Sequence, residues 1–224
     1  MRRIIYYTLI PVLLLLGSLW IISYASHAST KKVGYEKLTP VIASLNIPGE
    51  VTLAEFFSYG CPACNVVEPA LEKWLSEHKY VVFQRVPSIF RPEWEIYAKA
   101  YYVAKHFGIS EKITPGLFKA IQEQNRNLST MEQMADFFAG YGVNKKEFEN
   151  VFKYAPQING QIVRANNLFY QYKIFAIPSF VINGKYLTNA DMTGGDNEKL
   201  FKVIETLTRQ PSSQPPSQTH AENQ

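Results

Sequence analysis

The sequence predicts an α/β fold in which a strand–helix–strand unit and a strand–strand–helix unit flank a block of helices. The first unit is indicated by an apolar, β-prone run at residues 51–57 that leads directly into a helical pattern. The second is indicated by two short strand patterns around an Asn-Gly turn near residues 180–187. Between the two units, apolar residues recur at helical spacing.

The first unit begins with Val51–Phe57, which is typical of a buried strand and is broken by Ser58-Tyr59-Gly60. A second strand is expected at Tyr80–Val86, closed by Pro87. A helix joins them, because apolar residues fall on one helical face at Cys64, Val67, Leu71, Trp74 and Leu75. Such a unit is expected to be parallel and right-handed.

Residues 92–172 carry five helical patterns, separated by glycines and Asn144. Their apolar positions are Ile96, Ala100, Val103 and Phe107; Phe118 and Ile121; Met131, Met134, Phe137 and Phe138; Phe148, Val151 and Phe152; and Ile158, Ile162, Ala165 and Phe169. A hairpin then pairs Phe180–Ile182 with Lys185–Leu187 through Asn183-Gly184, and a last helix is expected from about Asp196 to Thr208.

The two ends of the chain differ from this body. Arg2 and Arg3 precede an uncharged run of about 20 residues, long enough to span a bilayer core of about 30 Å, and small residues follow it up to Ala28. Residues 1–28 are therefore expected to be a signal peptide, with an uncleaved membrane anchor as the alternative. In both cases the body is exported. Residues 29–48 form a lead-in, and the Pro/Ser/Gln-rich residues 210–224 are expected to be disordered.

Charge excludes one class of partner. Without residues 1–28 the formal net charge falls from +4 to +2. That is too near neutral for a nucleic-acid-binding protein, and no basic stripe interleaved with aromatic residues is present.

Both cysteines of the chain lie in Cys61-Pro62-Ala63-Cys64. A haem attachment site would need histidine directly after the second cysteine, where the chain has Asn65. A zinc site needs about four ligands, and no histidine has a zinc-finger spacing to the pair. An exported compartment permits disulfides. The pattern therefore favours a redox dithiol over a zinc site or an inert structural disulfide.

The position of Cys61 indicates which thiol reacts. Pro62 fits the first position of a helix. The sulfur of Cys61 would then face unpaired backbone N–H groups and the positive end of the helix dipole. This environment lowers a thiol pKa and stabilises the nucleophilic thiolate. Cys64 lies one turn further, within disulfide reach and more buried, as suits a resolving thiol.

The segments Glu55–Cys64 (EFFSYGCPAC) and Ala176–Tyr186 (AIPSFVINGKY) resemble those of the DsbA-like thiol-disulfide oxidoreductases of the bacterial periplasm. The resemblance extends over about residues 49–209. It implies a thioredoxin-like fold with a core at residues 49–89 and 174–209 and an inserted helical domain at residues 90–173. It also implies a periplasmic enzyme that introduces disulfides into unfolded or reduced exported proteins without a metal or an organic cofactor. A DsbB-type membrane partner would reoxidise it.

The same resemblance implies roles for residues outside the CPAC motif. Pro178 would form a cis peptide bond facing Cys61, and Ile177 would offer backbone hydrogen bonds to a substrate. An ordinary trans proline at a strand entrance is the alternative. Tyr59, in the turn, is expected to line the substrate surface.

Two acidic residues are further candidates. Glu55 lies within an apolar strand, where an anion is costly to bury without a partner. A raised pKa would let its carboxyl move the proton of Cys64, and an ion-paired or edge-exposed glutamate is the alternative. Glu68 matches a family glutamate on the active-site helix, although alone it would pass as a solvated helix acid.

One departure concerns the direction of the reaction. Pro62-Ala63 stands where many strongly oxidising members carry Pro-His, and Ala63 has no side-chain donor to stabilise a thiolate. A weaker oxidant is therefore expected. A disulfide isomerase or reductase stays open, although residues 29–48 are too few for the usual dimerisation domain. A non-catalytic, chaperone-like module with a structural disulfide is the other alternative.

Overall fold

The computed structural model describes residues 34–41 and 45–210. The signal peptide or anchor expected at residues 1–28 lies outside them, as does the tail expected to be disordered, apart from Gln210. Both stay predictions. Within the described part of the chain, no helix is long and apolar enough to cross a bilayer.

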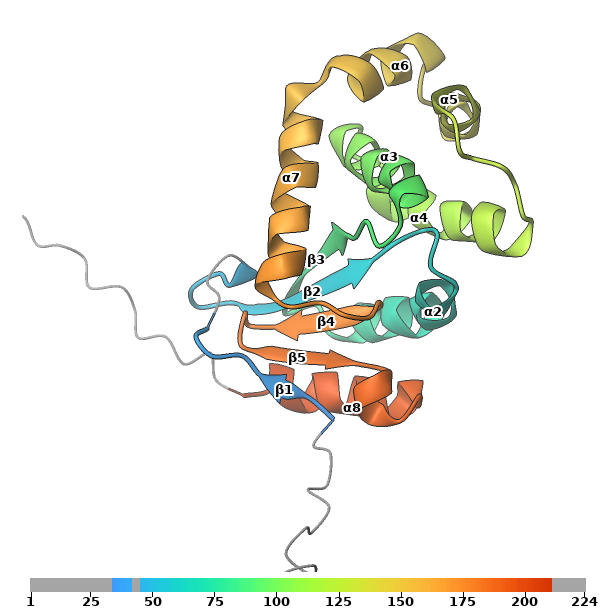
Figure 1. Cartoon of the computed structure of the whole chain (residues 1–224). Helices are drawn as coiled ribbons and strands as arrows, with labels where there is room; N and C mark the ends of the chain where they lie inside the picture. The colour runs from blue at the N-terminus through green and yellow to red at the C-terminus, as the bar shows by residue number, and fades with distance from the viewer. Residues whose placement is uncertain (1–33, 42–44, 211–224) are drawn as a thin grey trace, which may run out of the picture. The chain divides into compact units, whose positions relative to one another are not determined.

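Five strands, the first of which is β1 (Glu36–Lys37), form one sheet in the order β1-β5-β4-β2-β3 within the described residues (Figure 1). Strands β2 (Val51–Phe57) and β3 (Val81–Pro87) are parallel and are joined by helix α2 (Pro62–Glu77). Strand β4 (Ser179–Ile182) pairs antiparallel with β2 and with β5 (Tyr186–Asn189). The predicted mixed fold, with its two units on one sheet, is confirmed.

The chain between β3 and β4 is helical, as predicted. It contains the 3-10 turn η2 (Pro92–Trp94), the α-helices α3 (Glu95–His106), α4 (Ser110–Phe118), α5 (Met131–Ala139), α6 (Lys145–Tyr154) and α7 (Pro156–Gln171), and the π-helix η3 (Lys119–Glu123). Helix α4 runs directly into η3, where the sequence had predicted ordinary helix. After β5 come the 3-10 turn η4 (Asp191–Thr193) and helix α8 (Asn197–Thr208).

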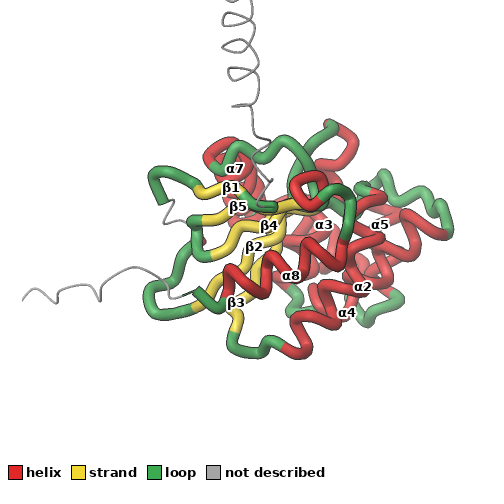
Figure 2. The backbone as a smooth tube through the Cα atoms, turned by 90° about the horizontal axis from the view of Figure 1, so that it is seen from below, coloured by secondary structure: helices red, strands yellow, loops and turns green. Residues whose placement is uncertain are grey.

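The sheet separates two apolar cores. Helices α2 and α8 pack beside each other on one face (Figure 2), and their core includes Leu53 of β2 and Phe180 of β4. Their strand neighbours Ala54 and Val181 belong to the other core, which is shared with helices α3 to α7. This alternation follows from the two-residue period of a strand. Tyr59 and Cys61 belong to this second core. The turn from β2 into α2 therefore packs against the helical segment.

Candidate active site

Cys61 is the N-cap residue of α2. Its backbone is extended, with φ −94° and ψ 113°, and Pro62 occupies the first turn. The sulfur accepts a hydrogen bond from the backbone N–H of Cys64 at 3.2 Å. A sulfur therefore takes the place that a serine or aspartate oxygen takes at an ordinary helix N-cap.

The thiol of Cys61 has a pKa below its ordinary value. The largest cause is a hydrogen bond from the side chain of Cys64, and the backbone N–H groups of Cys64 and Ala63 act in the same direction. Burial opposes them, as does the charge of Glu55. These donors stabilise the thiolate, which is the form that reacts in disulfide exchange. The shift has the direction that the helix position predicts.

Cys64 is the more buried of the two cysteines, with no exposed surface against 4% for Cys61. Burial raises its pKa well above the ordinary value, and the nearby Cys61 raises it further. Both residues are free thiols here. The pair thus consists of one sulfur that favours the thiolate and a second, enclosed sulfur that keeps its proton.

The loop before β4 closes over Cys61. The Sγ of Cys61 lies 3.6 Å from the backbone oxygen of Ile177 and can donate its thiol proton there. The Ile177–Pro178 peptide bond is cis, as the resemblance implied. Pro178 is buried and Ile177 is half-buried. Phe175, two residues before Ile177, is 84% exposed.

Glu55 and Glu68 converge on a third residue, Arg85 of β3. The guanidinium Nε donates to Glu55 at 3.0 Å, and Nη2 donates to Glu68 at 2.6 Å. Each of the three residues is 5% exposed or less. The ion-paired alternative for Glu55 is therefore what the structure shows. The edge-exposed alternative for Glu55 and the solvated alternative for Glu68 do not hold.

This trio favours a state with one bound proton. Burial raises the pKa of Glu55, and it raises the pKa of Glu68 to about 8, while Arg85 partly offsets both shifts. Two carboxylates and one guanidinium would leave a net negative charge in a dry site, which is costly. One proton on the carboxyl pair makes the trio neutral. Among the described residues, Glu55 Oε1 and Glu68 Oε2 have no hydrogen-bond partner, so each oxygen is available to carry it.

The structure corrects the expectation for Tyr59. Its side chain has no exposed surface and its hydroxyl shares a 2.8 Å hydrogen bond with Thr114, so it cannot line a substrate surface. Its ring packs edge-on against Phe57 and Phe118. In contrast, Pro62 and Ala63 are exposed. The side chain at position 63 can therefore face a substrate.

Arg85 was missed by the sequence analysis, although a signal existed. In the parallel register of β2 and β3, Glu55 lies directly opposite Arg85. When a basic residue in a mostly apolar strand pairs directly with an acidic residue of the neighbouring strand, a buried ion pair is indicated. Gln122 was also missed. Its amide Nε2 donates to the backbone oxygen of Tyr59 at 2.7 Å, and no periodic pattern connects these two distant positions.

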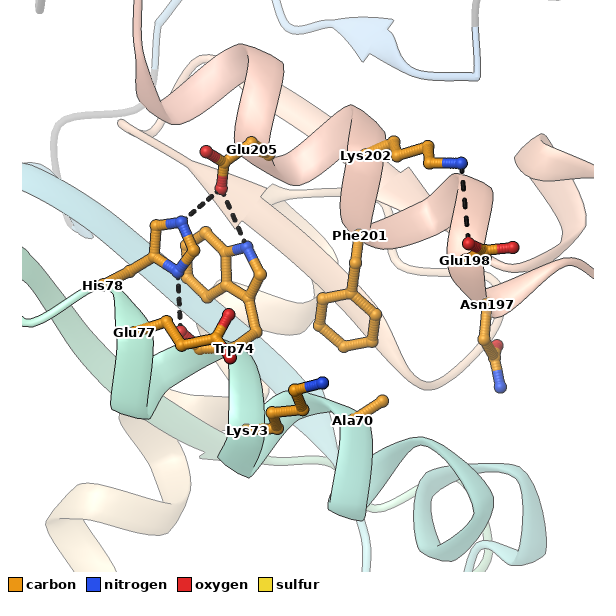
Figure 3. A pocket seen from close by; sticks show the side chains of 10 residues that line it. All are labelled: Ala70, Lys73, Trp74, Glu77, His78, Asn197, Glu198, Phe201, Lys202 and Glu205. Atoms are coloured by element: carbon orange, nitrogen blue, oxygen red, sulfur yellow. Dashed lines mark hydrogen bonds and ion pairs between the residues drawn. The ribbon is translucent and has the colours of Figure 1, made fainter.

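A pocket of about 530 Å³ lies elsewhere, between α2 and α8 (Figure 3). Trp74 and Phe201 form its apolar part. At one end Glu205 accepts from the indole of Trp74 and pairs with His78, which ties the end of α2 to α8. None of the predicted site residues lines this pocket.

Comparisons with known proteins agree with this geometry. A family model described as the DSBA-like thioredoxin domain matches residues 52–203. The thiol:disulfide interchange protein DsbA of Burkholderia cepacia is 38% identical over 146 residues, covering 65% of this chain and 68% of that protein. The protein of the same name from Pseudomonas aeruginosa is 33% identical over 154 residues, covering 68% and 72%.

Solved structures give the same result. The oxidoreductase DsbA from Xylella fastidiosa superposes with a TM-score of 0.71 at 26% identity, over 78% of this chain and 93% of that one. Pseudomonas aeruginosa DsbA gives a TM-score of 0.70 at 32% identity, over 78% and 90%.

Proposed function

The chain belongs to the family of DsbA-like thioredoxin domains, whose activity is thiol:disulfide interchange, and we propose that it introduces disulfide bonds into exported proteins through Cys61 and Cys64. One observation carries the proposal. The sulfur of Cys61 caps α2 and has a lowered pKa, while its partner Cys64 is enclosed and keeps its proton. A low thiol pKa makes a good leaving group in disulfide exchange.

The reaction begins from the Cys61–Cys64 disulfide. A substrate thiolate attacks Cys61, the bond between the two cysteines breaks, and Cys64 leaves as a thiolate that takes up a proton. A second substrate thiolate then attacks the substrate sulfur of the mixed disulfide and releases Cys61 as a thiolate. The substrate loses two electrons and forms one disulfide, and the protein gains the two electrons as two reduced cysteines.

The proton for Cys64 has a candidate source in the trio. Cys64 cannot stay ionised because burial strongly favours its neutral form. The charge of Glu55 raises the pKa of both thiols, as a smaller contribution than burial and hydrogen bonding. Glu55, with Glu68 as the second carboxyl, passes its proton to Cys64 on reduction, and the carboxyl pair then takes up another proton from solvent.

Substrate is held beside Cys61 by the loop before β4. The backbone of Ile177 lies next to the sulfur and offers hydrogen-bonding groups to an extended peptide, a form of recognition that accepts many sequences. Phe175 and Val66, both largely exposed, add apolar surface suited to unfolded chains. Reduced, unfolded proteins are therefore the substrate class.

The compartment and the reoxidising partner complete the proposal. An exported, periplasmic protein meets substrates that still need disulfides. Each cycle leaves Cys61 and Cys64 reduced, so a membrane partner of the DsbB type has to take up the two electrons.

The test uses the oxidised protein as the sole oxidant of a reduced peptide with two cysteines. Formation of the cyclic peptide, with one equivalent of reduced protein, is expected. A parallel reaction with a protein carrying scrambled disulfides separates the isomerase alternative, because an isomerase corrects these pairings in its reduced form. A disulfide that neither reaction consumes would support the structural, chaperone-like alternative. A redox titration against glutathione then gives the direction.

A further inference from the structure

The backbone groups of the turn before Cys61 are hydrogen-bonded partly within the turn and partly to a side chain outside it. The backbone N–H of Cys61 donates to the oxygen of Ser58 at 3.0 Å, and the N–H of Gly60 donates to the Ser58 hydroxyl at 3.2 Å. The carbonyl of Tyr59 is bonded from outside the turn, by the side-chain amide of Gln122 at 2.7 Å. This peptide group is the last but one before the catalytic residue.

Gln122 is held in an unusual piece of backbone. It lies in the π-helix Lys119–Glu123, where the N–H of Gln124 donates to the oxygen of Lys119 at 3.0 Å. A π turn shifts the direction of the following side chains relative to an α-helix, and such turns are frequent at functional sites. Here the buried residues Phe118 and Ala120 pack into the core, and Gln122 reaches Tyr59.

The same part of the chain holds the turn at two more points. The hydroxyl of Tyr59 is bonded to Thr114 of α4. Gly60 lies so close to Trp94 that an added Cβ would meet the indole nitrogen at 2.5 Å. Three residues between β3 and β4, namely Trp94, Thr114 and Gln122, thus contact Tyr59 or Gly60. Of these, Gln122 bonds to the main chain.

We propose that Gln122 is a positioning residue for the thiol exchange: by holding the Tyr59 carbonyl it keeps Cys61 in the N-cap geometry in which its sulfur accepts the hydrogen bond from the N–H of Cys64. The inference rests on the proposed function. The sulfur receives the N–H of Cys64 only while the Cys61 backbone stays extended at the helix start. A turn released at Tyr59 can rotate, and the sulfur then loses donors to the thiolate.

The test compares Gln122→Met with the wild-type chain. Methionine has a similar length, favours helix and offers no donor. The pKa of the Cys61 thiol, followed by thiolate absorbance, is expected to move towards the ordinary value. The equilibrium constant for reduction by glutathione is expected to fall about threefold to tenfold, the factor for one hydrogen bond. Gln124→Met is the matched control, because Gln124 is exposed at the end of the same π-helix and the Tyr59 carbonyl is held by Gln122.

A second variant separates positioning from loss of stability. Thr114→Val removes the bond to the Tyr59 hydroxyl and leaves its carbonyl held. It is expected to lower the free energy of unfolding and to leave the Cys61 pKa unchanged. If Gln122→Met does not fold, Gln122→Ser takes its place, because serine is too short to reach Tyr59.

The outcomes are distinct. If Gln122→Met folds and its Cys61 pKa equals that of the wild type, while the wild-type protein oxidises the peptide, this inference alone is overturned. Equal pKa shifts in Gln122→Met and Thr114→Val overturn it too, because both would then report a general loosening. A wild-type disulfide that exchanges with neither glutathione nor peptide overturns the proposed function instead.

Discussion

Replacing Glu68 by glutamine should remove a pH dependence of stability that the buried trio causes. Glu68 is 4% exposed, and its pKa is raised from 4.5 to about 8, first by burial. Between these two pH values the folded chain holds a proton that the unfolded chain has released. The free energy of unfolding therefore falls as the pH rises through this window, because the unfolded state binds fewer protons.

The size of the effect follows from one proton. The slope is about 1.4 kcal/mol per pH unit where one group is protonated in the folded state and ionised in the unfolded state. Between pH 5 and pH 7 the wild-type chain should lose about 3 kcal/mol relative to Glu68→Gln, the slope times two units. The glutamine side chain has the shape of the protonated acid, and its amide oxygen can still accept from Arg85.

The assay is urea unfolding at several pH values. The proteins are oxidised, because neither cysteine titrates while the two form a disulfide. Glu77→Gln is the control, since Glu77 lies exposed on the same helix. Its slope should match that of the wild type. Parallel slopes for Glu68→Gln and the wild type would refute the reasoning and would mean that Glu68 is ionised and fully compensated by Arg85 in the folded state.

Three other changes test the pair and its turn. Cys64→Ala should trap mixed disulfides on non-reducing gels and Cys61→Ala should not, because the thiol with the lowered pKa forms the intermolecular bond and the enclosed one resolves it. Ala63→His should lower the pKa of Cys61 and make the protein a stronger oxidant in a glutathione titration, where about 30 mV corresponds to 1.4 kcal/mol. Gly60→Ala should cost roughly 1–3 kcal/mol of unfolding free energy in urea, because its Cβ would overlap the ring of Trp94; a cost of zero would mean that the ring moves freely.

The fold could be predicted where a side-chain period extends over a whole element. Strand β2 begins and ends at the predicted residues, and the last helix, expected from about Asp196, begins at Asn197. Strand β1 (Glu36–Lys37) could not be predicted, because two residues carry no period and its pairing with β5 is set by tertiary contact. The π-helix η3 was missed for a related reason, since it changes the backbone hydrogen bonds and not the apolar pattern around it.

The site was predictable where chemistry is local in sequence. The N-cap position of Cys61 follows from the strand, the turn and Pro62, all within a few residues. Tyr59 was wrongly placed at a surface because it lies in a turn. Its hydroxyl is in fact buried and hydrogen-bonded to Thr114, which is distant in sequence. Gln122 could not be predicted without the fold, because its hydrogen bond to Tyr59 joins the helical block to the turn after β2.

The protonation of the trio and the acidity of Cys61 are linked. A negative charge on Glu55 raises the pKa of both thiols, so an ionised carboxyl pair would oppose the thiolate that the helix N-terminus stabilises. Arg85 with one bound proton makes the trio neutral and removes most of this opposition. Because Ala63 offers no side-chain donor of its own, the chain depends more on that neutrality than a chain with histidine at this position would. The oxidising strength of the pair should therefore decline as the pH rises and the trio loses its proton, in addition to the change that the cysteine protons themselves cause.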